Sequence, residues 1–157
     1  MPVHRVEALR VAMTELNVDS FVSLNRYTNQ YLSGFSGSTS AVVITKKEAH
    51  FLCDFRYTEQ AGTEVSGFEV CEVKGGCAVR AGERLRVLGA TKTAFNPDDM
   101  TCAQRDAIQK EYGSGVLVSD STLVSNLRMI KDESELEAMR AATDLAEGVL
   151  LDVLDDL

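Results

Sequence analysis

The sequence predicts an α/β domain in which a mixed, partly parallel sheet is flanked by helices. Short apolar runs of strand length, such as residues 41–45, alternate along the chain with longer segments that carry apolar residues at helical spacing. That alternation is typical of strands joined by crossover helices, and therefore of parallel pairing. Residues 41–45 and 50–53 are joined by a short polar turn, which predicts an antiparallel hairpin and makes the sheet mixed.

The first half of the chain opens with a helix. Residues 3–16 carry apolar side chains at Val6, Leu9, Met13 and Leu16, which is the spacing of one helix face. The elements that follow are a strand at 20–24, one or two helical turns at 27–32, and the hairpin strands at 41–45 and 50–53.

The second half continues the alternation, and turn-forming residues separate its elements. Gly75 and Gly76 break the pattern once, and Pro97 breaks it again. Gly82 lies inside an expected helix and costs about 1 kcal/mol relative to alanine, whereas Thr101 is a favourable N-cap. The expected elements are a helix at 56–65, a strand at 68–73, a helix at 78–88, a strand at 92–95, a helix at 102–112 and a strand at 115–119.

A further helix is expected from Lys131 to the end of the sequence. Asp132 and the glutamates after it suit a helix start, because negative charge is favourable near a helix N-terminus. The helix has no stop signal, since it ends in aspartates where a basic residue or a cap glycine is favoured. We therefore expect one domain at residues 1–130, and at 131–157 the start of a linker helix that continues in a longer protein. Its apolar stripe consists of Leu136, Met139, Ala142, Ala146, Val149, Leu150, Val153 and Leu157, and its closing aspartates are Asp152, Asp155 and Asp156.

Charge and composition exclude several classes of partner. The chain has 16 Lys and Arg against 24 Asp and Glu, a formal net charge of −8. This argues against nucleic acid, because phosphate binding requires clustered basic residues. No apolar run approaches the roughly 18 residues that a membrane span requires, and the start shows no apolar signal region. We expect a cytoplasmic chain with no membrane or nucleic-acid partner.

The cysteines are expected to be reduced thiols, since no pair has Cys-x-x-Cys spacing. Two of them lie on apolar strands, at positions 53 and 71, and should pack as small core residues. A zinc site would need convergent ligands, and only His4 and His50 could join the cysteines. We therefore expect no metal site in this chain. The four cysteines are Cys53, Cys71, Cys77 and Cys102.

Two short segments carry a family resemblance. The first is Asn29-Gln-Tyr-Leu-Ser-Gly-Phe-Ser-Gly-Ser38, and the second is Phe51-Leu-Cys-Asp-Phe-Arg-Tyr-Thr-Glu-Gln-Ala61. In this order, on either side of the strand at 41–45, they resemble the N-terminal domain of the creatinase, prolidase and Xaa-Pro aminopeptidase family of metallopeptidases. The tail also resembles the linker helix of that family, through Arg128, Ile130, Lys131, Asp132, Glu135, Leu136, Met139, Arg140 and Ala142.

The resemblance implies a ribonuclease H-like fold and no catalytic residues in this chain. In the family, two Asp, one His and two Glu of a C-terminal domain hold two divalent metal ions, commonly manganese, cobalt or zinc. The implied partners are that catalytic domain, a second copy of the chain, and short proline-containing peptides.

The residues present offer no substitute for that centre. Asp144 and Asp155 repeat the spacing of the first two family ligands, but a continuous helix would separate them by roughly 16 Å. His4 and Glu7 share a helix face, where a solvated pair is expected. No combination of Ser, His and Asp is credible for nucleophilic catalysis, because the two histidines lie in different elements.

The loop at 35–40 is the best candidate for substrate contact. In the creatinase branch of the family, an aromatic residue and an arginine of the corresponding loop reach the substrate, so the resemblance gives Phe35 the aromatic role. This loop has no arginine, and Ser36 and Ser38 offer neutral hydrogen bonds instead. The alternative is a loop that only covers the sheet edge.

Arg56 is the second candidate for the substrate cleft. It follows a strand and could pair with Asp54, Glu59 or a substrate carboxylate. A structural ion pair and a role facing the cleft therefore both remain open. Tyr31 and Tyr57 are expected to be packing residues.

These features favour the non-catalytic N-terminal domain of a cytosolic Xaa-Pro dipeptidase or aminopeptidase, which shapes the substrate cleft and mediates dimerisation. Two alternatives remain: a stand-alone binding module, and the N-terminal domain of a creatinase-like amidinohydrolase. The reading frame after Leu157 distinguishes the peptidase domain from the stand-alone binding module, because a peptidase gene continues there with codons for the five metal ligands.

Overall fold

A computed structural model of the chain describes residues 2–155. Its elements alternate as the sequence predicts, with boundaries that agree within one or two residues. In chain order they are α1 (Pro2–Glu15), β1 (Ser20–Ser23), α2 (Arg26–Ser33), β2 (Ala41–Thr45), β3 (Ala49–Cys53), the 3₁₀ turn η1 (Phe55–Tyr57), α3 (Thr58–Glu64), β4 (Glu69–Glu72), α4 (Cys77–Val87), β5 (Lys92–Phe95), α5 (Cys102–Tyr112), β6 (Val116–Ser119), α6 (Leu123–Met129) and α7 (Glu133–Asp155).

The strands form one mixed sheet in the order β4-β3-β2-β1-β5-β6. Strand β2 pairs antiparallel with both β1 and β3, which confirms the hairpin. The other pairs, β1 with β5, β3 with β4 and β5 with β6, are parallel. The carboxyl ends of β3 and β4, at Cys53 and Glu72, therefore meet at one edge of the sheet.

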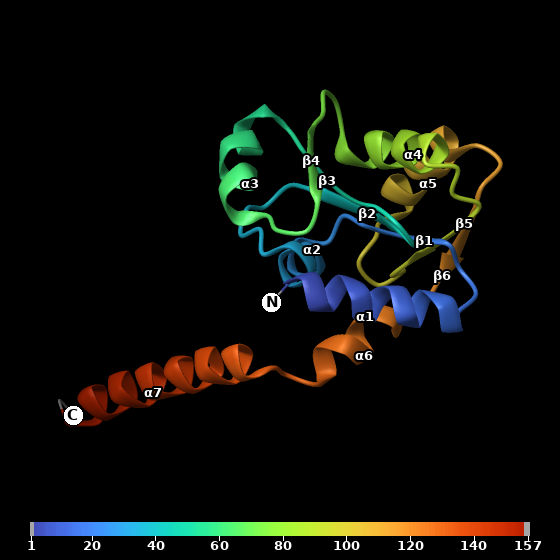
Figure 1. The fold of residues 1–157 in the computed structure, drawn as a ribbon. Coiled ribbons are helices and arrows are strands. Elements are labelled where there is room, and N and C mark those ends of the chain that lie inside the picture. Colours follow the sequence, from blue (N-terminus) through green and yellow to red (C-terminus); the bar gives the residue numbers. More distant parts are fainter. Residues whose placement is uncertain (1, 156–157) are drawn as a thin grey trace. The chain divides into compact units, whose positions relative to one another are not determined.

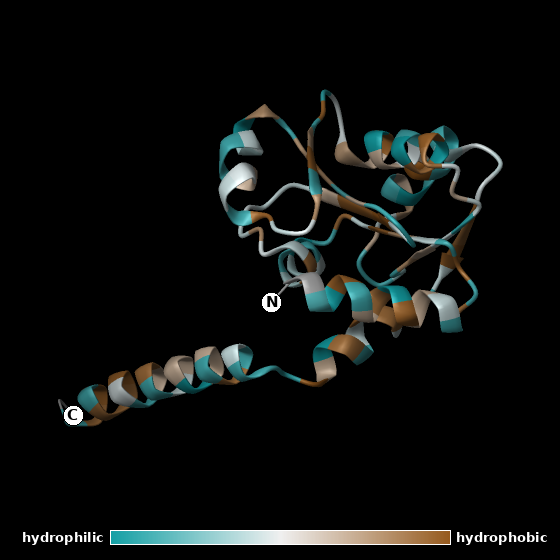
Figure 2. Cartoon of the chain, viewed as in Figure 1, coloured by the Kyte–Doolittle hydropathy of each residue, from teal (hydrophilic) through white to brown (hydrophobic). Residues whose placement is uncertain are grey.

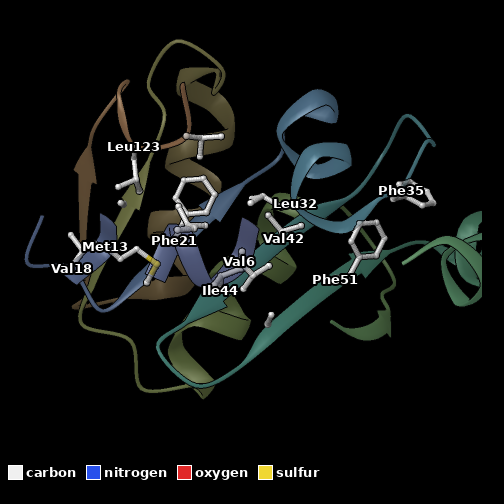
Figure 3. Close-up of a cluster of buried hydrophobic side chains, with 14 of the residues drawn as sticks. Val6, Met13, Val18, Phe21, Leu32, Phe35, Val42, Ile44, Phe51 and Leu123 are labelled. Atoms are coloured by element: carbon white, nitrogen blue, oxygen red, sulfur yellow. The ribbon is translucent and has the colours of Figure 1, made fainter. Parts of the chain in front are cut away.

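Helices cover both faces of this sheet (Figure 1). On one face, α4 and α5 pack on strand residues such as Val43 and Leu52. The opposite face packs against α1, α2, α3 and α6, and Figure 3 shows Phe21, Val42 and Phe51 in this second core. Neighbouring residues such as Val42 and Val43 serve opposite cores because successive strand side chains point to opposite faces. Burying a side chain of this size contributes about 1.5–3 kcal/mol.

Gly82 sets how closely α4 and α5 approach each other. A Cβ at this position would lie 2.4 Å from the backbone carbonyl oxygen of Ile108 in α5. A larger residue would push the two helices apart in a tightly packed interior. The glycine that weakens α4 as a helix therefore permits the contact between helices.

Helix α6 is an element that the sequence analysis leaves unassigned. The carboxylate of Asp120 accepts hydrogen bonds from the backbone N–H groups of Thr122 and Leu123, at 2.8 and 2.7 Å, and so caps its start. Leu123 and Val124 then bury their side chains in the core beneath α1. The helix is too short for its apolar periodicity to stand out in the sequence.

All four cysteines are free. Cys53 and Cys77 are buried, and burial raises the pKa of both thiols, which makes them poor nucleophiles. Cys71 is only half-buried because β4 is an edge strand, and it packs against the border of the core on the α4 face. Cys102 is exposed.

Contacts divide the chain into two units, residues 1–127 and residues 128–157. In the second unit, α7 is one helix of 23 residues, so Asp144 and Asp155 share a helix as expected. Apolar and polar residues alternate along α7 (Figure 2), and none of its described side chains is buried. The expected stripe ends at Leu157, which, like Asp156, lies outside the described residues. Within residues 2–155, no helix is long and apolar enough to cross a membrane.

Candidate functional site

The loop between α2 and β2 begins at a well-defined helix end. Asn25 caps the start of α2 by accepting hydrogen bonds from the N–H groups of Tyr27 and Thr28. Gly34 ends the helix in the left-handed conformation, with φ of 88°, which glycine adopts without strain. The buried side chain of Asn29 holds the far end of the loop by donating hydrogen bonds to the carbonyl and hydroxyl oxygens of Ser40. Both ends of the loop are therefore fixed.

Phe35 turns inward at the start of this loop. Its side chain is fully buried, with its ring centroid 4.8 Å from that of Phe51 and 5.5 Å from that of Tyr57, both edge-on. Figure 3 shows its ring beside that of Phe51. The expectation that the Phe35 ring reaches a substrate does not fit this position, because apolar burial on the sheet takes the ring away from solvent. Phe35 instead anchors the loop.

Gly37 lets the loop cross directly over these rings. A Cβ at Gly37 would lie 2.3 Å from Cζ of Phe35 and 3.1 Å from Cε1 of Tyr57. A contact of 2.3 Å does not occur between non-bonded carbon atoms, so any larger residue would force the Phe35 ring or the loop to move. The loop is thereby held flat against the aromatic side chains.

Ser36 is exposed and is held by the end of α3. Its backbone N–H donates to Oε2 of Glu64 at 2.7 Å, and its hydroxyl donates to the same carboxylate. Gln60 donates to the Ser36 hydroxyl at 3.0 Å, and Arg26 donates to the Ser36 carbonyl oxygen at 3.2 Å. The hydrogen bond from the Ser36 backbone, followed by that from Gln60, lowers the pKa of Glu64 below its ordinary value. Glu64 therefore stays ionised and orders the loop at neutral pH.

Ser38 and Tyr57 connect the loop to the second motif. Their hydroxyl oxygens lie 2.7 Å apart, and the Ser38 side chain is exposed. Tyr57 therefore packs, as expected, but its hydroxyl also positions Ser38. The sequence gives no sign of this polar role, nor of the part played by Glu64 and Gln60, because no local pattern marks a partner that a distant helix supplies.

Arg56 forms the ion pair with Asp54 that was one of its two expected roles. Its Nη2 lies 2.6 Å from Oδ2 of Asp54, and its Nε donates to Oδ1 at 3.0 Å, a two-point contact. The hydrogen bond from the Arg56 side chain lowers the pKa of Asp54, and Asp54 raises that of Arg56. The Arg56 side chain is still 60% exposed, so it retains donors that face solvent.

An open pocket of about 580 Å³ adjoins this ion pair. It lies where β3 and β4 end, and the carboxyl ends of parallel strands are a common place for ligands. Phe55, which is 75% exposed, forms part of its apolar lining. Two cations, Arg56 and Lys74, also line it, together with Asp54, Glu72, Val73 and Gly75. The carboxylates of Asp54 and Glu72 balance these two cations, so the lining combines an apolar surface with charges of both signs.

The described residues do not form a hydrolytic centre around this pocket. Ser36 and Ser38 lie among Glu64, Gln60 and Tyr57, and no histidine accompanies them. Asp144 and Asp155 lie too far apart along α7 to share a metal cluster. Two Asp, one His and two Glu do not converge anywhere in residues 2–155.

The fold and the two motifs define a class of protein. Residues 5–130 match the creatinase/prolidase N-terminal domain family, and the chain belongs to that family.

Two longer proteins and one isolated domain resemble this chain. It is 29% identical over 150 residues to a Bacillus subtilis (strain 168) protein named uncharacterized peptidase YqhT. The alignment covers 96% of this chain and 42% of that protein. It superposes on an Xaa-Pro dipeptidase from Bacillus anthracis with a TM-score of 0.93 and 29% identity, over 100% of this chain and 44% of the other. It also resembles the crystallised N-terminal domain of cytoplasmic peptidase PepQ from Mycobacterium tuberculosis, with a TM-score of 0.74 and 26% identity, over 79% of this chain and 98% of that domain. The chain thus spans less than half the length of the first two relatives.

Proposed function

We propose that this chain is the non-catalytic N-terminal domain of a cytoplasmic Xaa-Pro dipeptidase or aminopeptidase. The observation that carries the proposal is the agreement of the whole chain, α7 included, with the dipeptidase from Bacillus anthracis. The peptide-bond chemistry would then belong to a C-terminal domain with two divalent metal ions. In that arrangement this domain restricts the substrate cleft and contributes to a homodimer.

The pocket at Arg56 supports a role in binding the substrate. A short peptide ends in a carboxylate, and a prolyl peptide also presents an apolar ring. Arg56 and Lys74 supply positive charge, and Phe55 supplies an exposed aromatic surface beside them. Ser36 and Ser38 add neutral hydrogen-bonding groups on the ordered loop nearby. Phe35 has no direct role in this proposal, because its ring is buried.

The reading frame beyond Leu157 provides the first test. The proposal requires a downstream domain that carries two Asp, one His and two Glu in the order of the family's ligands. The longer product should hydrolyse prolyl peptides, and the 157-residue chain alone should not. Hydrolysis of creatine instead would identify an amidinohydrolase, and a stop codon after Leu157 would identify a stand-alone binding module.

The role of Arg56 can be tested separately in the longer product. Arg56→Ala should raise KM for a prolyl dipeptide about 10- to 100-fold with little change in kcat, since a charged hydrogen bond contributes about 1.5–3 kcal/mol. Arg105→Ala removes another exposed arginine, from α5, and should leave both constants unchanged. An unchanged KM in Arg56→Ala would show that Arg56 does not bind the substrate and only forms the ion pair with Asp54. Sedimentation of the longer product would show whether it is a dimer.

A further inference from the structure

A second polar cluster lies away from the substrate pocket, on the sheet face that carries α4. His50 comes from β3, whereas Glu69 and Cys71 come from its parallel neighbour β4. The register pairs His50 with Glu69 and Leu52 with Cys71, so these side chains leave the two strands on one face. Residues that are 21 apart in the sequence are thereby brought into contact.

The distances within this cluster are close to those between the ligands of a zinc ion. Nδ1 of His50 lies 3.5 Å from Oε2 of Glu69 and 3.9 Å from Sγ of Cys71. Sγ of Cys71 lies 3.8 Å from Oε1 of Glu69. In a tetrahedral site with bonds of about 2.0–2.3 Å, the ligand atoms lie about 3.3–3.8 Å apart. The two Glu69 distances involve different carboxylate oxygens, and with one atom per residue the three ligand atoms lie within 4.8 Å of one another. The side chains would therefore close by up to about 1 Å to bind the ion.

A fourth residue orients the histidine ring. Nε2 of His50 lies 2.9 Å from Oε2 of Glu48, and the His50 side chain is 3% exposed. When Nε2–H donates to Glu48, the lone pair of Nδ1 is directed toward Glu69 and Cys71. A carboxylate on the distal nitrogen of a histidine is the usual support of a metal-bound imidazole.

The charges around the cluster also favour a cation. The carboxylates of Glu48 and Glu69 supply two negative charges beside His50, and Cys71 adds a third once zinc displaces its proton. Among the contacts of these residues, Arg84 supplies the positive charge, and its Nη2 donates to Cys71 Sγ at 3.5 Å. The Arg84 contact resembles the N–H donors that support metal-bound thiolates, and the remaining negative charge equals that which a divalent cation neutralises.

We propose that His50, Glu69 and Cys71 bind one zinc ion, with Glu48 holding the imidazole and water completing the coordination. On binding, the Cys71 thiol releases its proton to solvent and its sulfur forms the bond to zinc. The ion would fasten the edge strand β4 to β3. This site replaces the expectation that the chain has no metal site, and it is independent of the two-metal centre in the family's catalytic domain.

The 157-residue chain is suited to the test because it lacks that catalytic centre among its described residues. After dialysis against a chelator, it is titrated with zinc sulfate by calorimetry and with cobalt(II) by absorption spectroscopy. We expect one ion per chain, a thiolate-to-cobalt charge-transfer band in the near ultraviolet, and the visible bands of tetrahedral cobalt. Zinc should also raise the midpoint of thermal unfolding.

Matched variants identify the ligands. Cys71→Ser should abolish the charge-transfer band, whereas Cys102→Ser, at an exposed cysteine of α5, should keep it. Glu69→Gln should weaken zinc binding, and Glu72→Gln on the same strand should not. Glu48→Gln should weaken zinc binding about 10- to 100-fold, as loss of a supporting carboxylate does.

His50 is buried, so His50→Gln is interpreted only with its circular dichroism spectrum and against His4→Gln. The exposed positions Glu48 and Glu69 allow the test even when His50→Gln does not fold. The proposal is overturned when the wild-type chain binds no zinc at micromolar concentration. It is equally overturned when zinc affinity is the same in Cys71→Ser and Glu69→Gln as in the wild type. In that case Glu48, His50 and Glu69 form a polar network that binds no metal.

Discussion

The hydroxyl oxygen of Ser38 lies 2.7 Å from that of Tyr57 and joins the glycine loop to the segment after β3. Beneath this hydrogen bond the Tyr57 ring packs edge-on against Phe35. The two sequence motifs therefore form one continuous surface, in which an apolar anchor supports an exposed hydroxyl group.

The coupling between Ser38 and Tyr57 can be measured in a double-mutant cycle. Ser38→Ala and Tyr57→Phe should each lower the free energy of unfolding by about 0.5–1 kcal/mol, near the low end for a hydrogen bond because the pair is exposed. The double variant should lose little more than either single variant. Denaturant unfolding measures all four proteins. As a control, the changes in unfolding free energy caused by Ser114→Ala, at another exposed serine, and by Tyr57→Phe should be additive. Additive effects of Ser38→Ala and Tyr57→Phe would refute the coupling between Ser38 and Tyr57.

Gly37→Ala should disrupt the loop. The added Cβ would lie 2.3 Å from the Phe35 ring, so either the ring or the loop must move. We expect a loss of about 1–3 kcal/mol in the free energy of unfolding, as for an overpacked core. Gly62→Ala is the matched control, because a Cβ at Gly62 in α3 meets no atom within 4 Å. That control should stabilise the chain by up to about 1 kcal/mol, and equal effects of the two substitutions would contradict the prediction.

Asp19 should make the stability of the sheet depend on pH. Its carboxylate accepts hydrogen bonds from the backbone and hydroxyl groups of Thr91 and from the backbone N–H of Lys92, and so ties β1 to β5. Burial alone would raise the pKa of Asp19, but these hydrogen bonds and one from Ser20 outweigh burial and lower it below its ordinary value of 3.8. Asp19→Asn should therefore cost about 1–3 kcal/mol at pH 7.

The sign of the pH dependence follows from the lowered pKa. The stabilisation by Asp19 is complete above the pKa of the unfolded state and is lost as the pH falls through the lower pKa of the folded state. The difference in unfolding free energy between the wild type and Asp19→Asn should shrink below about pH 4. Asp106→Asn, at an exposed aspartate of α5, should change stability by less than about 0.5 kcal/mol at every pH. A difference that grows on acidification would contradict the assignment.

The last turns of α7 should fray in the 157-residue chain. Leu150, Val153 and Leu154 are each more than half exposed, and a helix without a packed apolar face is only marginally stable in water. Asp152 and Asp155 add negative charge at the negative end of the helix dipole. Hydrogen exchange of a demonstrably monomeric sample should be fast from Leu150 onward. Slow exchange through Leu154 would show that α7 is stable by itself and needs no further surface.

The candidate site shows where sequence reasoning reaches its limit. The two motifs identify the loop and Arg56, because glycine, serine and a charged residue after a strand are local signals. The burial of Phe35 is not a local signal, since an aromatic residue next to glycine suits a core and a binding surface equally well. The partners Glu64 and Tyr57 are 28 and 19 residues from the serines they hold, and no periodicity connects them.

The sequence by itself determined the alternation of strands and helices and the β2–β3 hairpin, because apolar periodicity and turn residues act within a few neighbouring positions. The family followed from the resemblance of the two short motifs, at 29–38 and 51–61, to known family members. Only the tertiary structure decided which strands are neighbours. The order of the strands in turn decided which residues far apart in the sequence come into contact. Parallel pairing of β3 and β4 brings His50 to Glu69 and Cys71, and packing of α4 on α5 explains Gly82. These contacts depend on the register and closeness of elements far apart in the chain, where burial of the shared core outweighs any local preference.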